Sequence, residues 1–342
     1  MTKTVKYSLI ATLAVIIIIT SVVIWATSAL LRPCFSLNET AYIYVRPTTS
    51  EADICQQLQT EAQARTVIGW KMASRLTGFT PRTGRYAVEP GDAMLNVFRR
   101  IKNGIQTPVR FTIPSVWTLD RLAGVMAGKL MLDSTEVAEA LRDSAYVAQW
   151  NYSTATLPAL FIPNTYELYW DVSLEAFMQR MIRENETFWK QEQRNELAAR
   201  LEMTHEEVVT LASIVDSETA NNGEKPRVAG LYLNRLKQHI PLQADPTVKF
   251  AVGDFGLRRI RGEHLRIESP YNTYRHEGLP PGPIRIASIA GIDAVLHHEN
   301  HTYLYMCAKE DFSGTHNFAS NYAQHKANAR RYQQALNARG IR

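Results

Sequence analysis

Two acidic residues near the middle of the chain, Asp216 and Glu218, stand at the end of a predicted helix. Thr204 and Glu207 have the spacing of a capping box, which predicts that the helix begins just after Thr204. The apolar residues that follow recur at helical spacing: Val208, Leu211, Ala212 and Val215. Glu218 continues this apolar face, whereas Asp216 lies about 200° from it around the helix.

A carboxyl group on a face that points to the core has a raised pKa, because desolvation disfavours its charged form. A side chain that holds its proton near neutral pH is suited to general-acid catalysis. The sequence therefore predicts that Glu218 is a general acid. A structural alternative is open, in which Glu218 ends the helix and pairs with a buried arginine such as Arg227 or Arg235.

Other kinds of catalytic chemistry have little support in the sequence. All nine histidines follow residue 200. One cluster has the order His-His-Glu-Asn-His at residues 297–301, which is not the His-Glu-x-x-His pattern of a zinc site. No Gly-x-Ser-x-Gly, P-loop or dinucleotide fingerprint occurs. We therefore expect no metal and no cofactor.

Composition places further bounds on the protein. The 342 residues suffice for two or three modest domains. The net charge of +5 is small and the cations are scattered, so we expect no nucleic-acid partner, whereas an acidic polymer or an anionic membrane suits such a surface. A disulfide between Cys34 and Cys55 is left open, and Cys307 is expected to be a buried thiol.

The N-terminal region contains a long apolar segment, residues 8–31, which is long enough to cross a membrane as one helix. Lys3 and Lys6 precede the segment and Arg32 follows it, a bias that favours a cytoplasmic tail at residues 1–7. The rest of the chain would then lie outside the cytoplasm. A cleaved signal peptide is the alternative, although no clean Ala-x-Ala site follows the segment.

Residues 41–104 are predicted to form a small module in the order strand, helix, helix, strand, helix. Its elements are expected at residues 42–45, 54–58, 67–76, 84–88 and 94–101. The first four resemble a LysM-type module, which binds amino-sugar polymers. The alternative is a spacer that only positions the rest of the chain.

Residues 105–342 are predicted to form the main domain, with a linking helical region at residues 114–201 that ends in one long helix. The later elements are expected as helices 204–218 and 224–237, a polar loop 243–247, an arginine-rich excursion 255–268, an extended loop 278–284, a helix 286–297, a strand 302–308 and a helix 322–337. The prolines and glycines of loop 278–284 exclude a helix or central strand there. We expect this loop and loop 243–247 to border a groove beside Glu218.

Several motifs occur in one order along the chain. They are Phe161-Ile-Pro-Asn-Thr-Tyr166, Ala212-Ser-Ile-Val-Asp-Ser-Glu-Thr219, Asn234-Arg235, Gln243-Ala-Asp-Pro-Thr247, Tyr271-Asn-Thr-Tyr274, Gly278-Leu-Pro-Pro-Gly282 and His316-Asn-Phe318. Together with the single anchor and the LysM-like module, they resemble the YceG-like endolytic murein transglycosylases (MltG). The family's catalytic Glu falls on Glu218. Asp216 replaces the usual Glu of the first motif, and Asn164 replaces an Asp that we interpret as a turn-former.

The resemblance implies an enzyme that cuts the glycan strand of peptidoglycan between N-acetylmuramic acid and N-acetylglucosamine and leaves a 1,6-anhydro end. Glu218 would serve as acid and then as base. The expected substrate-binding residues are Gln243, Asp245, Thr247, Tyr271, Asn272, Tyr274 and His316, and the expected supporting residues are Asp216, Asn234 and Arg235. For each of these residues a purely structural role remains an alternative.

The predicted fold is α+β: an N-terminal transmembrane helix, a small LysM-like module and a lysozyme-like mixed α/β catalytic domain. The resemblance implies a single-pass protein of the bacterial cytoplasmic membrane with its catalytic domain outside. The expected partners are glycan strands, the membrane and membrane-bound peptidoglycan synthases. The competing functions are a hydrolase that adds water and a non-catalytic glycan-binding scaffold.

Overall fold

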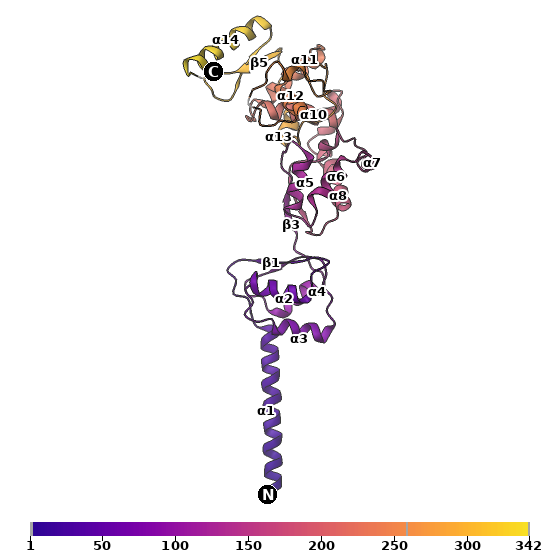
Figure 1. Cartoon of the computed structure of the whole chain (residues 1–342), viewed down its shortest axis with the longest axis vertical. Helices are drawn as coiled ribbons and strands as arrows, with labels where there is room; N and C mark the ends of the chain where they lie inside the picture. Colours follow the sequence, from indigo (N-terminus) through magenta and orange to yellow (C-terminus); the bar gives the residue numbers. More distant parts are fainter. Residues whose placement is uncertain (1–2, 258, 341–342) are drawn as a thin grey trace. The chain divides into compact units, whose positions relative to one another are not determined.

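The computed structural model describes residues 3–257 and 259–340. These residues form mainly helices, together with short two-stranded sheets, so the predicted α+β class is confirmed (Figure 1). Residues 1–2 of the predicted tail, residue 258 of the predicted excursion and residues 341–342 lie outside the described part. The chain forms two compact units. The first contains the chain up to Arg110 with Glu167–Val172, and the second contains Phe111–Tyr166 and the chain from Ser173 onward.

The first unit begins with helix α1 (Lys3–Leu31), which starts inside the predicted tail. Its portion Lys6–Leu31 is long and apolar enough to cross a membrane, as an anchor or a signal sequence would be. Residues 6–25 are exposed throughout, and within residues 6–31 protein covers only the last turns, where Leu30 packs on the core of the unit.

The rest of the first unit follows the predicted order of strand, two helices and strand. The elements are β1 (Ala41–Val45), α2 (Glu51–Thr60), α3 (Ile68–Thr77), β2 (Gly84–Val88) and α4 (Met94–Lys102). Strands β1 and β2 pair antiparallel, with Ile43 opposite Tyr86. Trp70 and Phe98 meet edge to face in the core. Cys34 and Cys55 are buried in the same core as free thiols.

The second unit opens with short elements and then two helices where one was predicted. These elements are α5 (Leu119–Ala127), α6 (Ser134–Arg142), α7 (Ser144–Ala148), the 3-10 helix η1 (Leu157–Leu160), α8 (Leu174–Lys190) and α9 (Arg194–Arg200). Strands β3 (Val109–Thr112) and β4 (Thr165–Leu168) form a two-stranded sheet, and the boundary between the two units falls within both strands. The predicted single helix 173–201 is wrong, because Glu192 and Gln193 take left-handed backbone angles and break it.

A contact between residues that are distant in the sequence explains the break between α8 and α9. It brings Arg194 to the start of α9, where its side chain is 4% exposed and donates to Asp293 at 2.8 Å. A buried guanidinium needs such a partner. The hydrogen bonds of Arg194 therefore favour a turn that local helix propensity does not predict.

Helix α10 (His205–Glu218) is the centre of the second unit. It packs against α11 (Lys225–Lys237), α12 (Asp245–Val252) and α13 (Ile289–Leu296), and every residue from Val208 to Val215 is buried. The sequence predicts one apolar face, but the helix is covered on all sides along this stretch. Helices that are buried all round have apolar or internally hydrogen-bonded residues on every face, and Ser213 meets this need by donating to Thr210 O at 2.7 Å.

Two element boundaries near α10 differ from the predicted ones. The polar loop 243–247 ends early, because Asp245 begins α12 and Pro246 occupies its first turn, a favourable position for proline. Helix α13 starts at Ile289 rather than at residue 286, and Ser288 caps it by accepting from the Gly291 N–H. The extended loop 278–284 has no helix or strand, as predicted. A 3-10 turn, η2 (His264–Arg266), lies in the arginine-rich excursion.

The chain ends in a hairpin and a long helix. The hairpin is formed by β5 (Tyr305–Ala308) and β6 (His316–Ala319), with Cys307 opposite Asn317. Cys307 is half-buried, so the predicted buried thiol is only partly covered. Helix α14 (Tyr322–Ala338) packs on both strands of the hairpin, and none of its described residues is buried (Figure 1).

Candidate active site

Glu218 is held at the C-terminal end of α10. The predicted capping box is present at the other end: Thr204 accepts from Glu207 N at 3.2 Å, and Glu207 accepts from Thr204 N at 2.8 Å. Glu218 Oε1 accepts a hydrogen bond of 2.7 Å from the hydroxyl of Tyr232, on α11. Tyr232 is 2% exposed, whereas Glu218 keeps some contact with solvent.

The surroundings of Glu218 raise its pKa to about 7, chiefly because burial desolvates the carboxyl group. The Tyr232 hydrogen bond acts in the opposite direction, and so do the nearby charges of His316 and Lys249. The charge of Asp245 adds to the increase. Near neutral pH a large share of Glu218 is therefore protonated, as a general acid requires.

Neither arginine of the structural alternative pairs with Glu218. Arg227 bonds to Glu299 Oε2 at 3.0 Å. Arg235 donates to the carbonyl oxygens of Pro241 (2.7 Å) and Leu304 (2.7 Å). The raised pKa of Glu218 is therefore not offset by a bound guanidinium.

Glu218 opens onto a cavity of about 380 Å³. Six of the residues predicted for the site line it: Glu218, Arg235, Gln243, Asp245, Tyr274 and His316. The hairpin strand β5 contributes Tyr305 and its neighbours to one wall, and α14 contributes His325. Segments that are more than 100 residues apart in the chain thus meet at one carboxyl group.

Hydrogen bonds fix the polar residues that α12 and the loops beside it bring to the cavity. Asp245 accepts from the Tyr274 hydroxyl at 2.7 Å. Gln243 has a left-handed backbone with φ of 53°, and Arg235 Nη2 holds its side-chain oxygen at 2.7 Å. A non-glycine residue in this region costs about 1–3 kcal/mol and persists only when its neighbours hold it, which is common at functional sites.

His316 is oriented by a residue that the sequence analysis did not select. Glu224 accepts from the His316 backbone N–H at 2.7 Å, and His316 Nδ1 lies 2.9 Å from its other oxygen. Burial alone would raise the pKa of Glu224, but the hydrogen bonds from His316 hold it below its usual value. The ring nitrogen Nε2 is not used in this pair.

Three of the predicted substrate-binding residues are not part of the cavity lining. Thr247 and Asn272 are both fully buried, and Asn272 donates to the Leu265 and Ile267 carbonyl oxygens. Thr247 donates to Ala244 O at 2.7 Å. Tyr271 packs on Phe250. Thr247 and Asn272 thus hold backbone groups of the loops that carry Asp245 and Tyr274, and Tyr271 packs its loop against α12.

The segments that border the cavity beside Glu218 also differ from those predicted for the groove. The Asp-Pro-Thr segment reaches the cavity through Asp245, but loop 278–284 is absent from its lining. Instead the Ile284 N–H donates to Ser213 Oγ at 3.0 Å, on another side of α10. The part of the prediction that placed the Pro-Pro loop at the groove is therefore wrong for this cavity.

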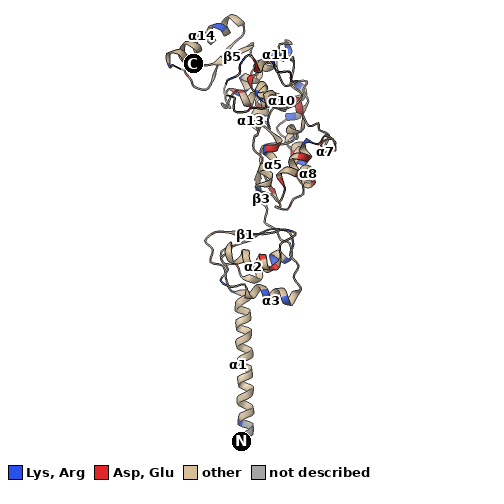
Figure 2. Cartoon of the chain, in the orientation of Figure 1, with Lys and Arg blue, Asp and Glu red and all other residues tan. Residues whose placement is uncertain are grey.

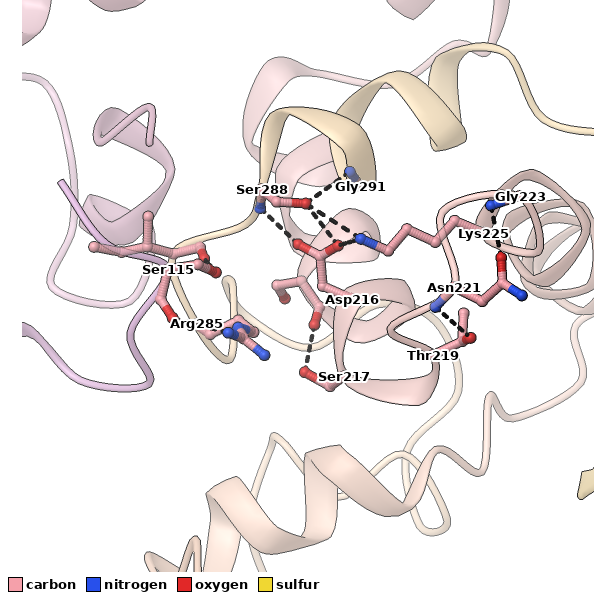
Figure 3. A network of polar contacts seen from close by, with 12 residues as sticks. Ser115, Asp216, Ser217, Thr219, Asn221, Gly223, Lys225, Arg285, Ser288 and Gly291 are labelled. Carbon is pink, nitrogen blue, oxygen red and sulfur yellow. Dashed lines mark hydrogen bonds and ion pairs between the residues drawn. The ribbon is translucent and has the colours of Figure 1, made fainter. Parts of the chain in front are cut away.

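The other acidic residue of the motif, Asp216, does not line the cavity, and its side chain belongs to a buried network (Figure 3). Lys225 Nζ lies 2.7 Å from Asp216 Oδ1, and the two side chains are 7% and 4% exposed. Ser288 donates to Asp216 from its N–H (2.5 Å) and its hydroxyl (2.8 Å). A Cβ at Gly291 would lie 2.5 Å from Asp216 Oδ1, so glycine is required there. This network ties α10 to α11 and α13.

Asn234, on α11, also connects two parts of the second unit through hydrogen bonds. Its amide donates to the carbonyl oxygens of His301 (2.7 Å) and Tyr303 (3.1 Å). With Arg235 it holds the segment before β5 against α11. The position of the hairpin wall therefore depends on two adjacent side chains of α11.

The residues that sequence reasoning missed are Tyr232, Glu224 and Lys225. A buried tyrosine needs a partner for its hydroxyl, so Tyr232 within the apolar pattern of a predicted helix was a usable signal. Glu224 and Lys225 carried no such signal, because charged residues at a helix start are usually solvated.

In the described part of the chain, no group of three His, Cys, Asp or Glu side chains is placed to hold a metal ion.

Fold and site thus define an α+β protein with an apolar N-terminal helix and a cavity built around one desolvated carboxyl group. The YceG-like family model matches residues 43–331. The chain therefore belongs to the YceG-like family.

Named relatives agree with this assignment. The chain is 35% identical over 145 residues to an endolytic murein transglycosylase of Bacillus subtilis (strain 168), covering 41% of this chain and 38% of that protein. It is 25% identical over 284 residues to an endolytic murein transglycosylase of Streptococcus pneumoniae, covering 72% of this chain and 50% of that protein. The chain thus spans half or less of the length of these curated relatives.

A solved structure supports the fold. The crystal structure of a putative YceG-like protein from Listeria monocytogenes matches with a TM-score of 0.59 and 24% identity. The match covers 85% of this chain and 99% of that one.

The Asp216–Lys225 pair gives a stability prediction. Asp216→Asn leaves the Lys225 ammonium buried without its counter-charge, which costs about 3–5 kcal/mol in such cases. We expect urea unfolding followed by circular dichroism to show this loss. The matched control is Lys225→Met with Asp216→Asn, which removes both charges and should recover part of it. A single variant as stable as the parent would contradict the assigned role of the pair.

Glu218 gives a prediction that requires no substrate. Below its ordinary pKa of 4.5 the carboxyl is protonated both folded and unfolded. Between 4.5 and about 7 the native state binds more protons, so the free energy of unfolding falls as the pH rises through this window. Glu218→Gln should therefore be more stable than the parent at pH 8, by about 3 kcal/mol, and similar to it at pH 4. Equal melting temperatures of the two proteins at pH 8 would show that the folded pKa is not raised.

Proposed function

We propose that this protein is an endolytic peptidoglycan lytic transglycosylase. It cleaves the bond between N-acetylmuramic acid and N-acetylglucosamine in nascent glycan strands, forms a 1,6-anhydro end and so limits strand length. The observation that carries the proposal is Glu218, a carboxyl group with a pKa of about 7 at a cavity lined by polar residues. Family membership and the names of the relatives support the same reaction class.

One group with this pKa suffices for the reaction. Protonated Glu218 gives its proton to the glycosidic oxygen as the bond from C1 of the muramic acid breaks. The developing positive charge at C1 is taken up by the sugar's own acetamido oxygen. The Glu218 carboxylate then takes the proton of the 6-hydroxyl, whose oxygen bonds to C1 as the bond between C1 and the acetamido oxygen breaks. The acid is restored, and no water is consumed.

Ordinary glycosidases use two carboxyl groups at a defined separation. Asp245 is the second carboxylate of this cavity, and the Tyr274 hydroxyl is bonded to it. We assign Asp245 to substrate binding together with Gln243, Tyr274 and His316. Tyr232 positions Glu218 through its hydrogen bond.

The remaining predicted residues are proposed to position the site. Thr247, Tyr271 and Asn272 hold the loops that carry Asp245 and Tyr274. Asn234 and Arg235 hold the hairpin wall, and Asp216 holds the end of α10 against α13. Each of these assignments follows from the hydrogen bonds and packing described above.

We further propose that α1 is an uncleaved anchor in the bacterial cytoplasmic membrane, with the rest of the chain on its outer side. The unit that contains β1, α2, α3 and β2 would then serve as a LysM-like module that binds glycan or spaces the main domain, residues 105–342. In this arrangement the site acts on new strands close to membrane-bound peptidoglycan synthases.

The product distinguishes the proposed reaction from hydrolysis. Mass spectrometry of sacculi digested by the purified protein should show internal cleavage with 1,6-anhydro ends. Reducing ends in their place would mean that water is the acceptor, with Asp245 as the candidate second carboxylate. Glu218→Gln should lower turnover by at least about 10²–10⁴-fold, because the acid is lost, while glycan binding remains. Unchanged turnover would exclude Glu218 as the acid, and no turnover by the parent would favour a scaffold.

The two neighbours that act on Glu218 predict opposite changes in the pH profile. Activity should fall as Glu218 ionises above about pH 7. Asp245→Asn removes a charge that raises this pKa, so the falling limb of kcat/KM should move to lower pH. Tyr232→Phe removes a hydrogen bond that lowers the pKa, so the limb should move to higher pH. Shifts in the same direction for both variants would contradict this account of the site.

A further inference from the structure

Helix α3 carries an apolar row on its exposed side. Ile68, Met72 and Leu76 follow one another at four-residue spacing and so lie along one face of the helix. Ile68 is 42% exposed and Leu76 is 79% exposed, and Met72 between them is half-buried. The opposite face holds the buried Trp70 and Ala73. The row therefore lies outside the core of the unit.

Cations border this row on one side. Lys71 and Arg75 are exposed and lie one residue before Met72 and Leu76 along the helix. Helix α3 contains no acidic residue, as the blue ribbon without red in Figure 2 shows. Glu51 on α2 is the acid that lines the groove between the two helices, and it accepts a hydrogen bond of 3.1 Å from Trp70 Nε1. An apolar stripe with flanking lysine or arginine is the pattern of helices that lie in a membrane interface.

A close contact fixes α3 across the end of α1 (Figure 1). A Cβ at Gly69 would lie 2.2 Å from the carbonyl oxygen of Ala29, so only glycine allows this approach. Gly69 is adjacent to Ile68 in the sequence and lies about 60° around the helix from Met72. The apolar row therefore begins next to the place where α1 leaves the unit.

The length of the uncovered part of α1 places this contact at a membrane surface. Residues 6–25 are exposed throughout, and at 1.5 Å per residue they span about 30 Å, the thickness of the hydrocarbon core. Trp25 ends this stretch and is 54% exposed, as expected for an aromatic residue at the interface. Ala29 lies about 6 Å further along the helix. Interfacial helices bury their apolar face about 5–10 Å into the headgroup boundary.

We propose that α3 is an interfacial helix that docks on the outer surface of the membrane that α1 spans, with its apolar row among the lipid chains and Lys71 and Arg75 on anionic headgroups. The inference rests on the membrane anchor of the proposed function and not on the reaction. Docking holds the first unit against the bilayer in one orientation, because α1 and α3 then contact the lipid at an angle to each other.

The experiment uses the full chain in vesicles of phosphatidylcholine mixed with phosphatidylglycerol. A nitroxide is attached at Leu76→Cys, and its collisions with oxygen, which enters the bilayer, and with a water-soluble nickel chelate are compared by spin resonance. Ile17→Cys reports on the anchor. Tyr44→Cys on β1, which lies at the end of the unit away from α1 in Figure 1, is the matched exposed control. The parent chain treated with the same reagent gives the background.

The expected result is that the label at residue 76 meets oxygen and is shielded from nickel, while the label at residue 44 shows the reverse. Nickel access at residue 76 equal to that at residue 44, with residue 17 in the bilayer, would overturn the inference and leave the anchor intact. Shielding of residue 76 from both reagents would mean a protein contact and would also overturn it. Nickel access at residue 17 would refute the anchor and the inference together.

A second experiment tests whether Lys71 and Arg75 bind anionic headgroups. Lys71→Gln with Arg75→Gln should lower the ratio of lipid-bound to free α3 by about fivefold per charge in vesicles with phosphatidylglycerol. The same variant should match the parent in phosphatidylcholine alone. An equal decrease in both kinds of vesicle would contradict recognition of anionic headgroups. Glycan cleavage by the same variant in solution tests the reaction independently, since neither residue belongs to the cavity.

Discussion

The site depends on two opposite effects on the pKa of one carboxyl group, that of Glu218. Burial removes water from Glu218 and favours its neutral form, whereas the Tyr232 hydroxyl, at 2.7 Å, stabilises the charged form. If burial acted alone, the pKa would be higher still and the group would hold its proton too firmly to donate it to the leaving oxygen. If the hydrogen bond prevailed, the proton would be lost before it was needed. A pKa of about 7 lies between these limits, and it depends on the packing of α10 against α11.

The same helix turn carries two carboxyl groups with different surroundings. Asp216 has a lysine at 2.7 Å and two donors from Ser288, so its charge is compensated within the protein (Figure 3). Glu218 has no such cation bound to it among the described residues, and its oxygen meets only a neutral hydroxyl. Pairs of titratable groups whose surroundings differ in this way often divide structural and chemical roles. Here the division follows from the 200° between the two positions around α10.

The cavity is assembled from separate pieces that are tied to α11. Arg235 and Asn234 bind the segment before β5, Arg235 binds Gln243, and Glu224 at the start of the helix binds His316. These ties are hydrogen bonds of buried or half-buried groups, which are costly to leave unpaired. The positions of the cavity walls therefore depend on α11. On the first unit, Gly69 plays a comparable part by allowing α1 and α3 to touch.

The sequence by itself determined what depends on neighbours along the chain. The capping box and apolar spacing predicted α10 and selected Glu218, the prolines predicted loop 278–284, and the apolar run predicted α1. Contacts between distant residues decided the rest. The partner of Glu218 is 14 residues away on another helix, the break before Arg194 serves an ion pair with Asp293, and Thr247 and Asn272 turn inward to satisfy backbone groups. Local patterns report which face of an element is apolar, but a hydrogen bond across elements exists only after packing has brought its donor and acceptor together.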